Sequence, residues 1–154
     1  MDKKFILNSL VVLSFVALSF AYFVEFILGH APCNLCKIER IPYLGSIILI
    51  SLLFFIKRWE KIILSLVLLL FIFGGVTSIY HVGIEQDIFS ESLLCKLSMN
   101  NNIQNPDELL KSLEKTPISC KDVTFTIFGL SLATFNAFLS IVISYILLKL
   151  IIKK

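Results

Sequence analysis

Long runs of apolar residues, separated by short polar segments, dominate the chain. The runs cover residues 5–28, 38–56, 62–80 and 123–152. Each is near or above the roughly 20 residues with which a helix crosses about 30 Å of hydrocarbon. The alternation of apolar and polar positions that is typical of membrane strands is absent, and a bilayer offers no water to unpaired backbone groups. The pattern predicts an all-α membrane protein, a single four-transmembrane-helix bundle.

Composition and charge agree with a membrane protein. The chain is 57% hydrophobic and 16% charged, and its apolar content exceeds the globular average of about half. Eight basic residues lie at the chain ends and between the second and third runs: Lys3, Lys4, Lys57, Arg58, Lys61, Lys149, Lys153 and Lys154. The positive-inside rule makes this side cytoplasmic and leaves loops 29–37 and 81–122 outside. The net charge of +3 thus reflects topology, and we expect no nucleic-acid partner.

The first run also resembles a secretory signal peptide. Lys3 and Lys4 form a basic start, and Ser19-Phe20-Ala21 has the small residues of a cleavage site. The apolar run nevertheless continues to Leu28, beyond the 7 to 15 residues of a signal-peptide core. We therefore favour a retained span, and either interpretation leaves residues 29–37 outside.

All four cysteines fall in the two outside loops, which indicates an oxidising compartment. Cys33 and Cys36 form a CxxC motif in the first loop, and Cys95 and Cys120 lie in the second. Four cysteines allow three pairings. Pairing within each loop is the economical choice, although spacing alone leaves the others open.

Three chemistries compete for the CxxC motif. Zinc usually needs a second close cysteine pair, and Cys95 and Cys120 are widely separated, so we expect no metal site. Inert disulfides fit the second pair better than the first, whose two-residue ring adds little loop entropy. A CxxC thiol often has a depressed pKa, and in an oxidising compartment the motif is more often redox-active.

Arg40 lies at the start of the second run. The segment from Pro42 to Ile56 gives only about 22 Å of helix, so the span must also use Ile38 and Ile41. Arg40 is four residues beyond Cys36, and in a continuous helix its guanidinium can approach that sulfur and favour a thiolate. Snorkelling to lipid phosphate is the ordinary alternative.

These motifs, in this order along the chain, resemble the DsbB family of disulfide bond formation proteins. The resemblance rests on a CxxC after the first span, an arginine four residues beyond its second cysteine, a "RIP" start to the second span, "YHVGIEQ" at residues 80–86 and a second cysteine pair before the last span. It covers essentially the whole chain. Many members have Trp-Tyr-Gln where this chain has Lys37, Ile38 and Glu39, so local thiol chemistry can differ.

The resemblance implies a thiol:quinone oxidoreductase with two periplasmic redox loops in the bacterial inner membrane, both termini being cytoplasmic. A soluble periplasmic DsbA-like thiol oxidant would pass two electrons to Cys95 and Cys120. Exchange would move them to Cys33 and Cys36, and then to the membrane quinone pool, ubiquinone or menaquinone. In the family, the residue matching Cys95 forms the mixed disulfide with the partner, and the one matching Cys120 resolves it onto Cys33. Cys36 would contact the quinone.

Further polar and small residues have expected places. His81, at the outer end of the third span, is a candidate quinone ligand by the same resemblance, although an interfacial histidine is as often a simple anchor. Residues 105–117 read as a short capped helix whose Leu109, Leu110 and Leu113 face either the membrane surface or the helix ends. Gly74-Gly75 permits close helix approach, and Asn136 an interhelical hydrogen bond.

The rival function is a non-catalytic tetraspan scaffold or transporter subunit with structural loop disulfides. Transporters usually show paired repeats or broken mid-membrane helices with ionisable groups. The sequence shows neither feature, so we favour the oxidoreductase.

Overall fold

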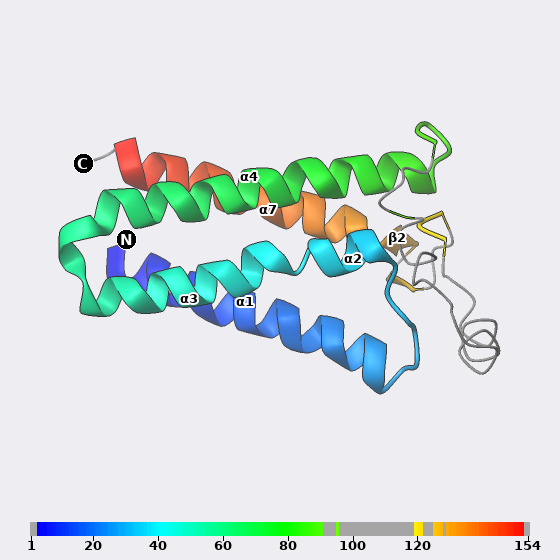
Figure 1. Cartoon of the computed structure of the whole chain (residues 1–154), viewed down its shortest axis with the longest axis horizontal. Helices are drawn as coiled ribbons and strands as arrows, with labels where there is room; N and C mark the ends of the chain where they lie inside the picture. Colours follow the sequence, from blue (N-terminus) through cyan, green and yellow to red (C-terminus); the bar gives the residue numbers. More distant parts are fainter. Residues whose placement is uncertain (1–2, 91–94, 96–118, 122–124, 128, 153–154) are drawn as a thin grey trace, which may run out of the picture.

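Four long helices lie along the length of the molecule (Figure 1). The computed structural model describes residues 3–90, 95, 119–121, 125–127 and 129–152. The elements in chain order are α1 (Lys3–Phe26), α2 (Asn34–Ile38), α3 (Ile41–Phe55), the 3₁₀ turn η1 (Lys57–Trp59), α4 (Glu60–Glu85), β1 (Thr126–Ile127), β2 (Leu130–Ser131) and α7 (Leu132–Ile152). Within the described residues, four segments are long and apolar enough to cross a membrane, α2 and α3 together forming the second. The predicted fold class is confirmed.

The two ends of the bundle carry different parts of the chain. The start of α1, the end of α7 and η1 lie together at one end (Figure 1). The segment after α1, the end of α4 and β2 lie at the other. Helix α4 packs on both α3 and α7, and α1 packs on α3. The described basic residues Lys3, Lys4, Arg58, Lys61 and Lys149 therefore lie in segments at one end, and the cysteine-bearing segments share the other end with Lys37, Arg40 and Lys121.

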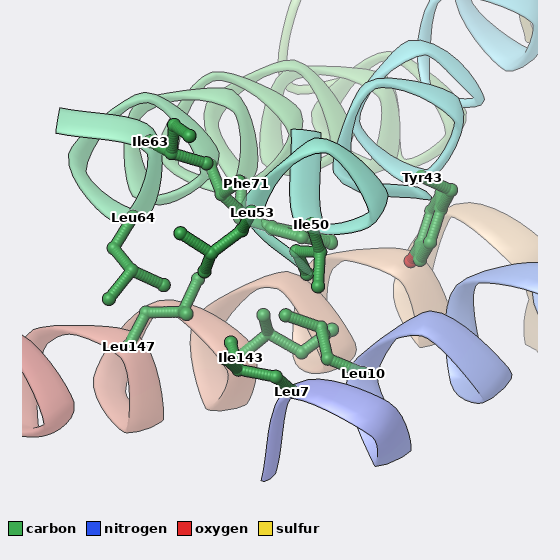
Figure 2. Packing of buried hydrophobic residues seen from close by; sticks show 11 residues of the cluster. Leu7, Leu10, Tyr43, Ile50, Leu53, Ile63, Leu64, Phe71, Ile143 and Leu147 are labelled. Atoms are coloured by element: carbon green, nitrogen blue, oxygen red, sulfur yellow. The ribbon is translucent and has the colours of Figure 1, made fainter. Parts of the chain in front are cut away.

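A cluster of large apolar side chains fills the space between the helices (Figure 2). All four long helices contribute to it: Leu7, Leu10, Tyr43, Ile50, Leu53, Ile63, Leu64, Val67, Phe71, Ile143 and Leu147. Large apolar residues such as Phe15 and Phe138 are also about two-thirds exposed on the outside. Apolar side chains both inside and outside are what a bundle surrounded by lipid requires.

Small residues bring the helices close together, as the Gly74-Gly75 pair predicts. A Cβ atom added at Gly74 would lie 2.7 Å from Cγ of Pro42 on α3, and one at Gly75 would lie 3.4 Å from Cβ of Ser140 on α7. In membranes, helices associate largely by such close packing. Gly74 and Gly75 therefore let α4 contact both neighbours.

The fourth helix starts later than the apolar run that predicts it. The run begins at residue 123, but α7 begins at Leu132, after an antiparallel pairing of Thr126 with Ser131 and Ile127 with Leu130. Gly129 makes the turn with φ +80°. The hydroxyl of Ser131 accepts a hydrogen bond from the backbone N–H of Thr134 (3.3 Å), which caps the helix. At 21 residues, α7 still spans about 32 Å.

Two other helix ends differ from the expected spans. The third helix continues beyond residue 80 to Glu85, which places His81 and Glu85 one turn apart on α4. The second span divides at residues 39–40, between α2 and α3, where Pro42 occupies the first turn. The expected short helix at 105–117, with Leu109, Leu110 and Leu113, lies outside the described residues.

Candidate functional site

The CxxC motif forms the start of α2. Cys33 is the N-cap, and its sulfur accepts a hydrogen bond from the backbone N–H of Cys36 (3.3 Å). The two Sγ atoms are 2.9 Å apart, and both residues are free thiols. The hydrogen bond with the Cys36 thiol lowers the pKa of Cys33 to about 4; burial opposes the shift, and the hydrogen bond and charge of His81 reinforce it. Cys33 is therefore the thiolate of the pair.

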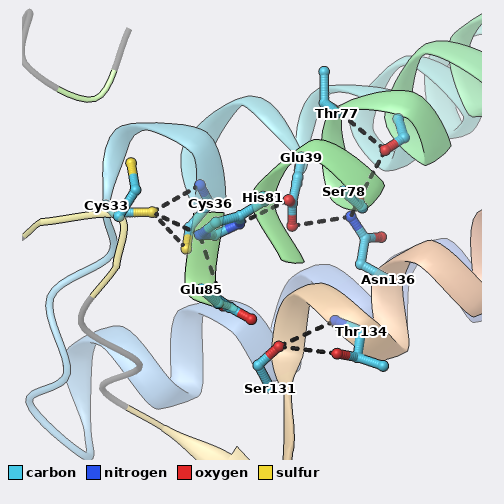
Figure 3. Close-up of polar contacts among 12 residues, drawn as sticks. Cys33, Cys36, Glu39, Thr77, Ser78, His81, Glu85, Ser131, Thr134 and Asn136 are labelled. Carbon is cyan, nitrogen blue, oxygen red and sulfur yellow. Dashed lines mark hydrogen bonds and ion pairs between the residues drawn. The ribbon is translucent and has the colours of Figure 1, made fainter. Parts of the chain in front are cut away.

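His81 joins this thiol to a buried carboxylate (Figure 3). Its Nε2 lies 3.5 Å from Sγ of Cys33, and its Nδ1 lies 2.9 Å from Oε1 of Glu39. His81 is 3% exposed and Glu39 7%. A buried charge is stable only when it is paired or fully hydrogen-bonded, so this contact fixes how the imidazole ring is oriented.

Asn136 completes the network from α7, as predicted for an interhelical hydrogen bond. Its Nδ2 donates to Oε2 of Glu39 (3.1 Å) and to Oγ of Ser78 (2.7 Å), and its Oδ1 accepts from the Tyr43 hydroxyl. The chain of contacts from Cys33 through His81 and Glu39 therefore links α2, α3, α4 and α7. Satisfied polar networks of this kind hold a site in one geometry.

Arg40 pairs with an acidic residue of α1. The helix is divided at residues 39–40, and Nη1 of Arg40 contacts Oε2 of Glu25 on α1 at 2.5 Å. The guanidinium also lies 4.8 Å from the ring centre of Tyr22. The guanidinium therefore pairs with α1, and Arg40 lines the same cavity as Cys36; its approach to the Cys36 sulfur stays a prediction. Glu39, the preceding residue, is the one that connects to the CxxC motif.

The second cysteine pair lies against the first. Cys95 and Cys120 form a disulfide with their Cα atoms 5.9 Å apart, which confirms the predicted pairing in the second loop. The predicted partners Cys33 and Cys36 are adjacent but reduced. One buried cluster contains Cys33, Leu35, Ile84, Cys95 and Cys120, with Cys36 and Tyr80 packed against it. The two cysteine pairs are therefore contiguous.

A cavity of about 390 Å³ opens beside the CxxC motif. Its walls are mainly apolar side chains of α1 and α7, including Val16, Phe20 and Leu139. Its polar lining includes His30 and Ser131, and also members of the network described above and their neighbours: Cys33, Cys36, Glu39, Arg40, Tyr43, His81, Glu85 and Asn136. Small-molecule sites typically enclose about 300–1,000 Å³ with a few polar groups in an apolar wall. The cavity therefore has the size and lining of a small-molecule site.

Sequence reasoning found some of these residues and missed others. It proposed His81 as a quinone ligand. His81 lines the cavity, and its two ring nitrogens face Cys33 and Glu39; the quinone contact stays a prediction. It treated Glu39 only as a departure from a family pattern and left Glu85 aside. Both acids adjoin apolar spans, and an ionisable residue there is a functional candidate by default. That signal would have found them.

The fold and site define a multi-span membrane protein with two juxtaposed cysteine pairs suited to thiol–disulfide chemistry. The chain belongs to the DsbB family: it matches the family described as "Disulfide bond formation protein DsbB" over residues 3–150. It is also 32% identical over 145 residues to a Rickettsia prowazekii (strain Madrid E) protein described as "Uncharacterized protein RP370", covering 91% of this chain and 83% of that relative. No solved structure matches the chain significantly. The family is one of membrane disulfide oxidoreductases.

Proposed function

We propose that the protein oxidises a soluble periplasmic DsbA-like dithiol protein and passes the electrons to a membrane quinone. The observation that carries the proposal is the contiguity of three features: the Cys95–Cys120 disulfide, the Cys33–Cys36 dithiol and the apolar cavity. Electrons can move between adjacent cysteine pairs by thiol–disulfide exchange without any other carrier. A structural staple would not need a reduced pair beside it.

In the first exchange, a partner thiolate attacks Cys95. The Cys95–Cys120 bond breaks, a partner–Cys95 disulfide forms, and Cys120 leaves as a thiolate. Cys120 attacks Cys33 of an oxidised CxxC, which frees Cys36. The partner's second thiol then displaces Cys95, and Cys95 attacks Cys120 and frees Cys33. The partner loses two electrons and two protons, and the CxxC gains them.

The end state of this sequence has a disulfide between Cys95 and Cys120 and two thiols at Cys33 and Cys36, the state found here. His81 Nε2 faces the Cys33 sulfur and can accept a thiol proton there, while Glu39 holds Nδ1. Cys36, Arg40 and Asn136 line the cavity and are the groups that would hold a quinone head group. A bound ubiquinone or menaquinone accepts two electrons and two protons, which restores the CxxC disulfide.

The proposal includes an orientation in the bacterial inner membrane. The end of the bundle with η1 and the termini carries basic residues and would face the cytoplasm. The cysteine end would then face the periplasm, where a soluble oxidant can reach it. Membrane-impermeant thiol reagents, applied after reduction, should label the cysteines from the periplasmic side; labelling from the cytoplasm alone would reverse this orientation.

The test of the relay is Cys120→Ala in full-length protein. In this variant Cys95 has no disulfide of its own, so its thiolate attacks the disulfide of the oxidised partner: a partner–Cys95 disulfide forms, and the other partner cysteine leaves as a thiolate. Because Cys120 is absent, this chain cannot move the mixed disulfide on to Cys33, and non-reducing electrophoresis and mass spectrometry should detect it. Cys95→Ala is the matched control and should trap nothing. Wild-type partner oxidation by Cys120→Ala, with no trapped species, would refute the relay.

The quinone step has a separate test in lipid nanodiscs with and without added ubiquinone or menaquinone. With quinone, the protein should oxidise many equivalents of the reduced partner. Without added quinone, turnover should stop once the oxidising equivalents already present on the protein have been consumed. Equal turnover in both preparations would show that another acceptor serves the CxxC pair.

A further inference from the structure

We propose that the reduced CxxC motif and His81 form a binding site for a thiophilic divalent cation, with Zn²⁺ as the best-fitting ion. Sγ of Cys33, Sγ of Cys36 and Nε2 of His81 lie within 4.8 Å of one another. Two thiolates and an imidazole are ligands that zinc prefers, and a set of three protein ligands leaves a fourth position open. From the cysteine spacing alone, we expected no metal site. The spacing does not reveal that α4 brings a third candidate ligand, His81, to the two sulfurs.

The separations are close to those that a tetrahedral ion needs. With Zn–S near 2.3 Å and Zn–N near 2.0–2.1 Å, a sulfur and a nitrogen ligand lie about 3.6 Å apart and two sulfurs about 3.8 Å. The Cys33 sulfur is 3.5 Å from Nε2 of His81, and the two sulfurs are 2.9 Å apart. The sulfurs must therefore separate by about 0.9 Å, which side-chain rotation of Cys36, the less buried of the two, can supply.

The imidazole is already oriented as a metal ligand. Nδ1 of His81 is held by Oε1 of Glu39, and Oε2 of the same carboxylate is held by Asn136. With Nδ1 directed at a carboxylate, Nε2 is the nitrogen left to ligate an ion, which displaces any proton there, and ligating histidines in zinc sites are commonly fixed in this way. Here Nε2 faces the Cys33 sulfur.

The fourth position has two sources of oxygen. All three ligand residues line the cavity, from which water can reach the ion. Glu85 lines the same cavity, and its Oε1 lies 3.8 Å from Nε2 of His81. A zinc ion here would therefore have two sulfurs, one nitrogen and one oxygen.

Binding at this site depends on the redox state of the motif. Zinc binds thiolates, so the ion displaces any remaining thiol protons, and joining the two sulfurs in a disulfide removes both ligands. The dithiol form binds the ion and the disulfide form does not. Bound zinc in turn occupies the sulfurs that must form the disulfide, so free zinc opposes reoxidation of the CxxC pair.

The experiment uses Co²⁺ as a spectroscopic probe for Zn²⁺ in full-length protein carrying Cys95→Ser and Cys120→Ser, so that Cys33 and Cys36 are the only thiols. The reduced protein should bind one Co²⁺ with thiolate-to-cobalt absorption, which Zn²⁺ abolishes. The same protein oxidised to the Cys33–Cys36 disulfide should show no such band. Protection of the reduced thiols from alkylation by Zn²⁺ gives a second readout in the otherwise unmodified chain.

Variants of His81 and Glu39 test whether the imidazole contributes to Zn²⁺ binding or whether the two thiols bind the ion alone. His81→Gln should weaken Zn²⁺ binding at least about 10-fold, and Glu39→Gln should weaken it by a factor within the 10–100 that loss of a ligand-orienting group typically costs. His30, the other of the two histidines, is the matched control, and His30→Gln should change nothing. Equal binding by wild type and His81→Gln would overturn the proposal. The proposed function is tested independently by measuring oxidation of the partner in the presence of a chelator, which removes metal from the assay.

Discussion

Toward the end of the bundle that holds η1, the buried side chains are mainly leucine, isoleucine and phenylalanine, whereas the buried side chains at the other end also include thiols, a carboxylate and an imidazole. Ile50 and Phe71 are fully buried among apolar neighbours. Glu39 and His81 are buried almost as deeply, but each contacts specific polar partners. The first end needs only volume and shape, while the second needs particular atoms at particular distances.

The difference teaches where this chain can tolerate change. In an apolar region, a substitution that conserves volume usually costs less than about 1.5 kcal/mol. Removing one partner of a buried charge pair costs about 3–5 kcal/mol, because the other charge stays buried without compensation. Conservative substitutions at the two ends should therefore have very different effects on activity.

The largest effect is expected for Cys36→Ser. Without this sulfur, Cys33 cannot form a disulfide within the motif, so electrons have no route to the cavity. Steady-state oxidation of the partner should fall to the rate measured without protein. Residual steady-state turnover would mean that the CxxC pair is not an obligatory carrier.

A second prediction concerns the pH dependence of Cys33. A thiolate reacts with an alkylating agent and a thiol does not, so reactivity falls as pH drops through the pKa. Because the pKa of Cys33 is lowered to about 4, alkylation should keep its full rate down to about pH 5 and be lost near pH 4. An ordinary thiol would show its midpoint near pH 8.5. Mass spectrometry of the Cys33 peptide, alkylated across this pH range, measures the midpoint. A midpoint near pH 8.5 would show that the cysteine end does not lower the pKa of Cys33, and the electrostatic difference between the two ends would be lost.

Glu39→Gln should have the next largest effect. It removes the charge that holds Nδ1 of His81, and a hydrogen bond to a charged group is worth about 1.5–3 kcal/mol. Reoxidation of the CxxC pair should slow roughly 10- to 150-fold. Glu25→Gln is the control for the alkylation rate of Cys33, because Glu25 contacts Arg40 rather than His81. Equal effects of both variants on Cys33 alkylation would argue for a general charge effect rather than the specific contact.

Gly74→Ala probes the packing between the two ends. The added Cβ would lie 2.7 Å from the Pro42 ring, which cannot rotate away, so overpacking should cost about 1–3 kcal/mol of stability. In Gly45→Ala the Cβ would lie equally close to Cδ1 of Leu70, the far end of a flexible side chain. Thermal unfolding in detergent should show the larger loss for Gly74→Ala. A larger loss for Gly45→Ala would contradict this account of the α3–α4 contact.

The smallest effect is expected for Ile50→Val in the apolar cluster. Loss of one methyl group from a fully buried position should cost about 0.5–1.5 kcal/mol. Partner oxidation should stay at the wild-type rate, because Ile50 lies away from the polar network. A loss of activity comparable with Glu39→Gln would show that the two ends are not functionally separate.

The sequence by itself determined the spans, because a helix in a bilayer satisfies its own backbone groups and needs only sufficient apolar length. It also placed the cysteines in two loops and favoured the Cys95–Cys120 pair. Small residues at positions 74–75 and an amide at 136 indicated close helix contacts, and the structure confirms both.

Only the tertiary structure decided which polar groups meet. Contacts such as His81 with Cys33, and Arg40 with Glu25, depend on how each helix is rotated about its own axis. Spans that are apolar on every side carry little information about that rotation. It is fixed by packing between helices and by pairing of the few buried polar groups, both of which join residues far apart in the chain. For this reason the cysteines could be read from the sequence, but the imidazole and carboxylate that complete their site could not.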